Sequence, residues 1–144
     1  MNEDKHTLAI LLIGELLAAD HSVRGRLGRV LPKGMEISHF SVLNHLAWQK
    51  GESSPARLAE KFGVTRGAMT NTLTKLEWAG YVHIRPDWDD ARRKMVGISP
   101  AGLQARNDAL AAITPMIDQI VEELGEEQTR AALPILREIR VKLA

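Results

Sequence analysis

The sequence predicts a mainly α-helical chain that carries one small β-hairpin. Three observations lead to this prediction. Apolar residues recur at intervals of three and four over most of the chain, Ser-Pro or threonine precedes three of these patterns, and only residues 81–85 and 94–98 look like strands. Because 144 residues suffice for one domain with a sizeable core, we expect a single domain over residues 1–144.

The first predicted helix covers residues 7–31, where apolar side chains follow helical spacing. Ile10, Ile13 and Leu17 widen its apolar stripe in the N-terminal half. A helix that is apolar on two sides needs two packing partners, so we expect that half to lie in a core or a subunit interface. The sequence Pro-Lys-Gly at 32–34 ends the helix.

Three shorter helices are predicted next. The second helix covers residues 38–49. The third begins at Ser54, an N-cap, with Pro55 in its first turn, and it ends at Gly63. The fourth follows the N-cap Thr65 and runs to residue 78, with its buried stripe at positions 69, 73 and 76. The glycine turn between the last two makes them a helix-turn-helix pattern.

The predicted hairpin follows directly. Its strands, 81–85 and 94–98, are joined by a charged loop that is too long for a tight turn. A Ser-Pro start at 99–100 opens a long helix to about residue 124, which Pro115 should kink. Gly125 separates it from a last helix over 126–143. These two helices supply more apolar surface than a small monomer needs.

The exposed face of the fourth helix is a candidate DNA-binding surface. A helix that enters a major groove needs small residues for close approach, short polar groups for base edges and cations for phosphates. The candidate residues on this helix are Thr65, Arg66, Gly67, Ala68, Thr70, Asn71 and Lys75. We add Ser54, at the start of the preceding helix. A plain solvated helix is the alternative, although such a surface usually prefers Glu, Lys and Gln.

The hairpin loop is the second candidate DNA-binding element. Arg92, Arg93 and Lys94 place three cations at its tip, and guanidinium groups suit the negative potential of a minor groove. Asp90 is predicted to orient Arg92 through an ion pair. Residues 50–100 hold nine Lys or Arg against six Asp or Glu, so the positive charge of the chain gathers here. The alternative is a solvated loop in which such pairs contribute only about 0–1 kcal/mol.

Other chemistries are disfavoured by residue type and spacing. The chain has no cysteine, which excludes disulfides and thiol redox sensing and fits a reducing compartment. Asp87 and Asp89 match the start of a calcium loop, but the glycine and glutamate that such a loop needs are missing. As a catalytic pair they would lack the burial that tunes carboxyl pKa values. The histidines show no i, i+3 or i, i+4 pair, so we expect no metal and no other cofactor.

Phe40 and Trp48 are candidates for lining an apolar ligand cavity. Aromatic residues make up only 4% of the chain, so a tryptophan on the second helix is conspicuous. Packing in the core is the competing interpretation and the commoner one for such residues.

The N-terminal segment bears on the compartment. Its longest apolar run, residues 8–13, is too short to cross a bilayer, which needs about 20 residues. Acidic residues at 3, 4 and 15 argue against a signal peptide. We therefore expect a cytoplasmic protein without a membrane partner.

Several motifs resemble those of the MarR family of bacterial winged helix-turn-helix regulators. Residues 90–102, from Asp-Ala-Arg to Ile-Ser-Pro-Ala-Gly, are similar to the family's wing signature of Asp-x-Arg, a strand and Leu-Thr-x-x-Gly. Residues 58–66, Leu-Ala-Glu-Lys-Phe-Gly-Val-Thr-Arg, resemble its helix-turn-helix, and residues 76–82 resemble the segment that follows. The resemblance covers nearly the whole chain. One departure is Asn71, which stands where the family frequently has arginine.

The resemblance implies a winged helix-turn-helix lobe over residues 38–99 and dimerisation helices over residues 1–37 and 100–144. It implies a homodimeric, ligand-responsive repressor of a pseudo-palindromic operator in double-stranded DNA. The helix after Thr65 would read the major groove, and Arg92 would enter the minor groove. It also implies a small aromatic or anionic effector that binds between the dimerisation helices and the lobe.

Two other classes of function compete with a DNA-binding regulator. In the first, the winged scaffold binds protein partners and the basic loop is incidental. In the second, the chain is an enzyme, for which only the acidic residues of the hairpin loop speak. The slim, cationic face of the fourth helix favours DNA over both.

Overall fold

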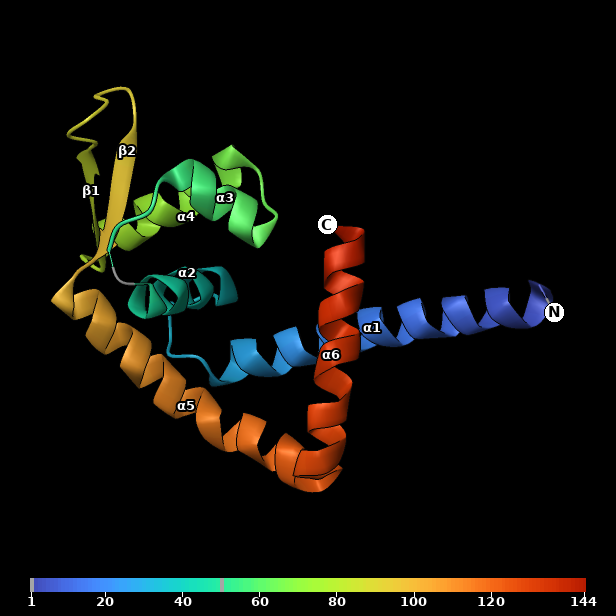
Figure 1. Ribbon diagram of the computed structural model, residues 1–144. Helices are drawn as coiled ribbons and strands as arrows, with labels where there is room; N and C mark the ends of the chain where they lie inside the picture. The colour runs from blue at the N-terminus through green and yellow to red at the C-terminus, as the bar shows by residue number, and fades with distance from the viewer. Residues whose placement is uncertain (1, 50) are drawn as a thin grey trace.

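The computed structural model describes residues 2–49 and 51–144. These residues form six helices and a two-stranded hairpin. In chain order they are α1 (Asn2–Val30), α2 (Ile37–Trp48), α3 (Pro55–Phe62), α4 (Arg66–Trp78), β1 (Val82–Pro86), β2 (Lys94–Ile98), α5 (Pro100–Leu124) and α6 (Glu126–Leu143). In Figure 1, α2, α3, α4 and the hairpin form a lobe, from which α1 and α5 lead away toward α6. The predicted mainly α-helical fold with a β-hairpin wing is confirmed. Lys50, which was counted in the basic charge of residues 50–100, lies outside the described residues.

The helix starts follow the serine and threonine signals in the sequence. In each case the side-chain oxygen accepts a hydrogen bond from the backbone N–H three residues later, at 3.0–3.2 Å: Ser54 before α3, Thr65 before α4 and Ser99 before α5. Gly63 ends α3 with a φ of 62°, in the left-handed region that favours glycine. The turn between α3 and α4 is therefore set by local signals.

Some predicted boundaries differ from the structure. The first helix begins at Asn2 rather than at residue 7, because nothing between these positions breaks a helix. β1 begins at Val82 rather than at residue 81. Tyr81 instead closes α4, since its N–H donates to the carbonyl of Leu76 at 2.9 Å. α5 remains helical through Pro115 to Leu124.

The core of the lobe lies where α2, α3, α4 and the hairpin meet. It consists of apolar side chains that are at most 4% exposed: Val42, Leu43, Leu46, Leu58, Ala59, Met69, Leu73, Leu76, Val82 and Val96. The predicted buried stripe of α4 is part of this core. A smaller cluster of Leu31, Ala109 and Ile113 joins the end of α1 to α5. Burial of this kind stabilises by roughly 1.5–3 kcal/mol per large side chain, so α4 is held firmly by its inner face.

Apolar side chains outside the lobe are largely exposed. On α1 and α6 they are Leu8, Ile10, Leu11, Leu12, Ile13, Leu17, Val23, Val30, Leu133, Ile135, Leu136, Val141 and Leu143. Ile10 and Leu17 are 60% and 67% exposed, so the wide stripe of α1 is not covered by the core of its own chain. Contiguous apolar surface of this extent marks an interaction site.

Helix α1 also has the length and composition of a membrane-crossing helix. A window within Asp4–Val30 reaches a mean hydropathy of 1.2, and 0% of it is buried inside the chain. The expectation that no segment is apolar enough to cross a bilayer does not hold for α1. Its longest uninterrupted apolar run is short, but the mean hydropathy over the helix is high. A helix whose apolar face is covered by another protein chain can have the same composition. Arg24 and Asp20, within this stretch, form an exposed ion pair at 3.0 Å.

The junction between the lobe and α5 is tightly built. Ser99 donates its N–H to the carbonyl of Tyr81 at 3.0 Å and its hydroxyl to the carbonyl of Gly80 at 2.6 Å. Gly102, in the first turn of α5, approaches the same strand so closely that a Cβ would lie 2.0 Å from the Tyr81 carbonyl oxygen. This contact fixes where α5 leaves the lobe.

Candidate nucleic-acid interface

The outer surface of α4 carries most of the predicted DNA-binding residues. Those that are exposed on or just before this helix are Thr65, Arg66, Gly67, Ala68, Thr70, Asn71 and Lys75. The hydroxyl of Thr74 donates to the carbonyl of Thr70 at 2.8 Å, so it is turned back onto the helix. Within the described residues, the side chains of Thr70 and Asn71 have no hydrogen-bond partner and face solvent. They are the polar groups that this face offers to a ligand.

A groove joins α4 to the hairpin. It has a volume of about 300 Å³, and α4 contributes Thr70 and Thr74 to its wall. The hairpin lines the same groove with Ala91 and Lys94 and with residues 84–86, and Pro55 at the start of α3 also lines it. The helix and the basic loop therefore bound one continuous surface.

The hairpin loop holds the predicted ion pair. Asp90 Oδ1 accepts hydrogen bonds from the backbone N–H of Arg92 and from its Nε, both at 3.1 Å. These bonds from Arg92 lower the pKa of the Asp90 carboxyl below its usual value. The Arg92 side chain is still 91% exposed, so the pair directs it without covering it. Arg93 and Lys94 are exposed beside it.

Ser54 is a correction to the predicted set. It is only 6% exposed, and its hydroxyl already caps α3 through the N–H of Arg57. A side chain so enclosed does not reach outward to DNA. Its predicted role reduces to shaping the start of α3.

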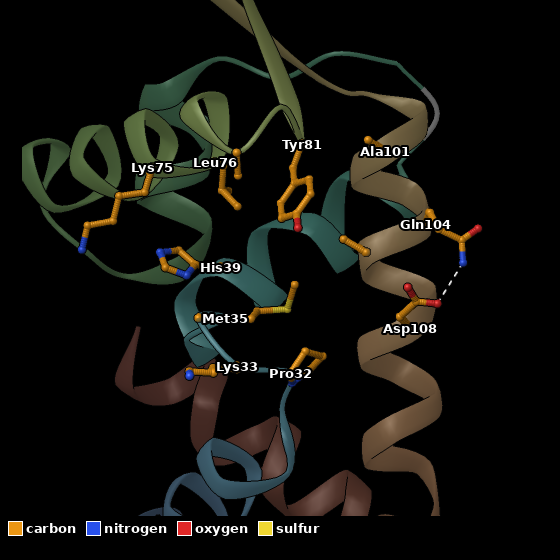
Figure 2. A pocket seen from close by; sticks show the side chains of 13 residues that line it. Pro32, Lys33, Met35, His39, Lys75, Leu76, Tyr81, Ala101, Gln104 and Asp108 are labelled. Atoms are coloured by element: carbon orange, nitrogen blue, oxygen red, sulfur yellow. Dashed lines mark hydrogen bonds between the residues drawn. The ribbon is translucent and has the colours of Figure 1, made fainter.

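Lys75 is exposed, but it stands apart from Arg66. Residues nine apart on a helix point in directions about 180° apart. Lys75 lines a cavity beside α4, together with Leu76 and Ala79. Figure 2 shows Lys75 on the side of this cavity away from α5. The sequence prediction placed Lys75 on a phosphate and did not foresee this second surface.

The cavity lies between the α1–α2 connection, α4, the start of β1 and α5, and has a volume of about 530 Å³. Its walls are Pro32, Lys33, Gly34, Met35, His39, Lys75, Leu76, Ala79, Tyr81, Ala101, Gln104, Ala105 and Asp108. In Figure 2, Lys33, His39 and Lys75 lie on the side of the cavity opposite α5. On the α5 side, Asp108 accepts a hydrogen bond from Gln104 at 2.8 Å. The cavity thus combines apolar walls with cationic side chains at one edge.

Phe40 and Trp48 do not line this cavity. Phe40 packs against the cluster of Leu31, Ala109 and Ile113. Trp48 is 75% exposed at the end of α2, with the Arg106 guanidinium 6.0 Å from its ring centre. The interpretation of Trp48 as a core residue is therefore wrong, and its role in lining a ligand cavity stays a prediction. Trp48 lies at the last residue of α2, beyond the part of the helix that packs in the core.

His39 is the buried polar group at the cavity. It is 8% exposed, and its Nδ1 accepts a hydrogen bond from the N–H of Glu36 at 3.1 Å. Burial lowers the pKa of His39, and Lys75 lowers it further, against an opposing effect of Glu36. The imidazole is consequently held neutral, with Nδ1 free of a proton.

This state of His39 predicts a pH dependence of stability. The unfolded chain takes up a proton near the ordinary pKa of 6.5, and the folded chain only at lower pH. The contribution of His39 to the free energy of unfolding is therefore full above that pKa and is lost as the pH falls below it. We expect His39→Gln to lose less stability than the wild type between about pH 7.5 and 5.5 in urea unfolding. Parallel losses in the two proteins would contradict this assignment.

The residues that the structure describes were compared with the needs of a metal site. No group of three or more His, Asp or Glu side chains is placed there to hold a metal ion. His45 instead packs edge-on against Phe62, with ring centres 5.8 Å apart.

Comparison with known proteins agrees with this geometry. The MarR family model matches residues 33–93. The uncharacterized HTH-type transcriptional regulator YdgG of Bacillus subtilis (strain 168) is 28% identical over 145 residues, covering 99% of this chain and 95% of YdgG. The transcriptional regulator BldR from Sulfolobus solfataricus has a TM-score of 0.76 at 25% identity, covering 90% of this chain and 95% of BldR. A MarR mutant from E. coli complexed with operator DNA has a TM-score of 0.78 at 20% identity, covering 91% and 95%.

A helix-turn-helix followed by a basic hairpin defines a winged-helix DNA-binding protein. The family match and the relatives then narrow this class: residues 33–93 match the MarR family, and over nearly its whole length the chain is similar to transcriptional regulators. Members of this family regulate transcription and are not enzymes, so the enzyme alternative is excluded.

Proposed function

We propose that the protein is a homodimeric repressor that binds a pseudo-palindromic operator. The observation that carries this proposal is the groove that Thr70 and Thr74 of α4 share with Ala91 and Lys94 of the hairpin, beside the exposed Arg92 and Arg93. In this proposal α4 enters the major groove with Thr65, Arg66, Gly67, Ala68, Thr70 and Asn71. Arg92 reaches the minor groove, and Arg93 and Lys94 contact phosphates. Residues 38–99 then form the DNA-binding lobe.

The helices outside the lobe supply the dimer interface in this proposal. The exposed apolar side chains of α1 and α6 need a cover, and a second copy of the chain offers an equal surface. Covering α1 in this way also removes its apolar face from lipid, so we place the protein in the cytoplasm. Two lobes related by a twofold axis would contact half-sites about 34–36 Å apart.

The cavity beside α4 is the proposed effector site. Lys33 and Lys75 favour an anionic group, while Leu76, Met35 and Pro32 favour an apolar or aromatic body. A ligand there would contact the same helix that reads DNA. It would regulate only if its affinity differs between the free and the DNA-bound dimer.

Arg92→Ala tests the assignment of the hairpin loop to DNA. We expect DNA affinity to fall by about tenfold, most strongly at sites with narrow A/T-rich minor grooves, because the guanidinium is exposed and directed by Asp90. The measurement is fluorescence anisotropy with labelled duplexes from upstream of the gene, at matched salt.

Arg130→Ala serves as the matched control. Arg130 is also an exposed arginine in an ion pair, with Glu126 at 3.7 Å, but it lies on α6 outside the lobe. Its replacement should leave DNA affinity unchanged. Equal affinities for the Arg92 variant and this control would remove the wing from the proposed interface.

A further inference from the structure

One side of the hairpin carries an arginine whose guanidinium makes three hydrogen bonds to protein groups. Arg85 of β1 donates from Nε to Glu52 Oε1 at 3.0 Å, and Nη2 donates to the same oxygen. Nη1 donates to the carbonyl of Pro86 at 2.8 Å. The ring centre of Trp88 lies 4.7 Å from the guanidinium carbon, within range of a cation–π contact. Because its guanidinium is hydrogen-bonded to Glu52 and Pro86 and stacked on Trp88, Arg85 is held by the protein rather than directed toward DNA.

Glu52 anchors this arrangement to the segment that leads into α3. The neighbouring residue, Ser53, pairs with Val96 of β2 through two backbone hydrogen bonds at 3.0 and 2.7 Å. Gly97 leaves room for the acid, since a Cβ there would lie 3.3 Å from Glu52 Cγ. Glu52 is thus held against the hairpin by backbone contacts that are independent of Arg85.

Trp88 extends the arrangement into the hairpin loop. Its indole is 80% exposed, although it rests on a guanidinium that is itself fixed. Two residues later comes Asp90, which directs Arg92. The contacts of Glu52, Arg85 and Trp88 are therefore joined through two residues of backbone to the Asp90–Arg92 pair at the tip of the loop.

We propose that Glu52, Arg85 and Trp88 form a wing brace, a set of positioning residues that sets the direction of the hairpin loop and so the place of Arg92 relative to α4. This inference rests on the proposed role of the wing in DNA binding. The brace acts through Arg92 and makes no DNA contact of its own. The alternative to a positioning role is that the half-buried Glu52–Arg85 ion pair contributes only to folding stability.

Arg85→Lys tests the brace without removing charge. Lysine cannot present the planar fork that pairs with Glu52 and stacks on Trp88. We expect DNA affinity to fall by about threefold to tenfold at matched salt, with the salt dependence and the melting temperature close to those of the wild type. In an Arg92→Ala background the same change should have no effect, because the side chain that the brace positions is gone.

Arg106→Lys is a close control. Arg106 also donates to a side-chain oxygen, that of Asn44 at 3.0 Å, and also lies over a tryptophan, Trp48, but it does so between α5 and α2. Its replacement should leave DNA affinity unchanged. An Arg85→Lys loss that is equally large with and without Arg92 overturns the brace. So does the absence of any loss when Arg92→Ala itself lowers DNA affinity.

A second measurement needs no DNA. The chain has three tryptophans, so Trp48→Phe with Trp78→Phe leaves Trp88 as the only indole. We expect the fluorescence anisotropy of Trp88 to be high, as for a ring that tumbles with the lobe. Arg85→Lys should lower this anisotropy and leave the circular dichroism spectrum unchanged. An anisotropy that does not respond to Arg85→Lys overturns the brace even if Arg92 binds DNA. A clear response combined with a silent Arg92→Ala leaves the brace in place and removes the proposed role of the wing.

Discussion

The double replacement Ile10→Lys and Leu17→Lys is expected to convert the protein from a dimer to a monomer and to abolish tight operator binding. The two side chains lie seven residues apart on the same stripe of α1 and are 60% and 67% exposed. Like charges placed on both copies of a self-complementary interface repel across it. Because a dimer binds its second half-site at high effective concentration, its loss should lower operator affinity by about 10²- to 10⁴-fold.

Sedimentation equilibrium and DNA titration measure the two parts of this prediction. Ser22→Lys, an exposed polar position on the same helix, adds charge about 120° around the helix from Ile10 and should remain dimeric. Circular dichroism of the double variant should keep the helical signal, since these side chains contribute nothing to the core of the lobe. A double variant that stays dimeric and binds its operator would mean that the stripe is covered by something other than a second copy.

Local signals explain why the helix-turn-helix could be predicted from the sequence. Ser54, Thr65 and Ser99 each cap a helix with a hydrogen bond to a residue three positions away, so a short stretch of sequence contains the whole interaction. The buried stripe of α4 follows in the same way from helical periodicity. The Asp90–Arg92 pair spans only two residues and was predicted for the same reason.

Contacts between distant segments explain what the sequence did not reveal. Glu52 and Arg85 are 33 positions apart, and no spacing rule relates a residue before one helix to a residue on a later strand. The cavity is likewise assembled from segments between Pro32 and Asp108. Trp48 was misplaced because helical spacing gives the direction of a side chain but not where the neighbouring elements end. Such features depend on tertiary distances.

Helix α4 links the two surfaces that the proposed function requires. Thr70 and Asn71 face outward, while Lys75, Leu76 and Ala79 line the cavity. Its inner face is packed in the core by Met69 and Leu73, so we expect a displacement to carry the whole helix rather than bend it at one residue. A ligand that shifts the cavity wall therefore shifts the residues assigned to the major groove. Helix α5 forms the opposite wall of the cavity, so a ligand between the two helices would displace α4 relative to α5.

The contact that fixes α5 gives the last prediction. Gly102→Ala is expected to lower the free energy of unfolding by about 3 kcal/mol and the melting temperature by roughly 10 °C. An alanine Cβ would lie 2.0 Å from the Tyr81 carbonyl oxygen, a backbone atom that cannot rotate away. Relief requires α5 to move from the strand, which strains the hydrogen bonds that Ser99 makes to Tyr81 and Gly80.

Gly67→Ala isolates the steric effect from helix propensity. Gly67 also lies in the first turn of its helix, but a Cβ there meets nothing within 4 Å. Alanine normally favours a helix over glycine by about 0.5–1 kcal/mol, so this variant should be neutral or more stable. Only Gly102→Ala should therefore lower the free energy of unfolding when the two variants are compared at one fixed protein concentration. Equal effects would show that the lobe and α5 are not held as closely as this junction requires, and the cavity between them would lose its fixed wall.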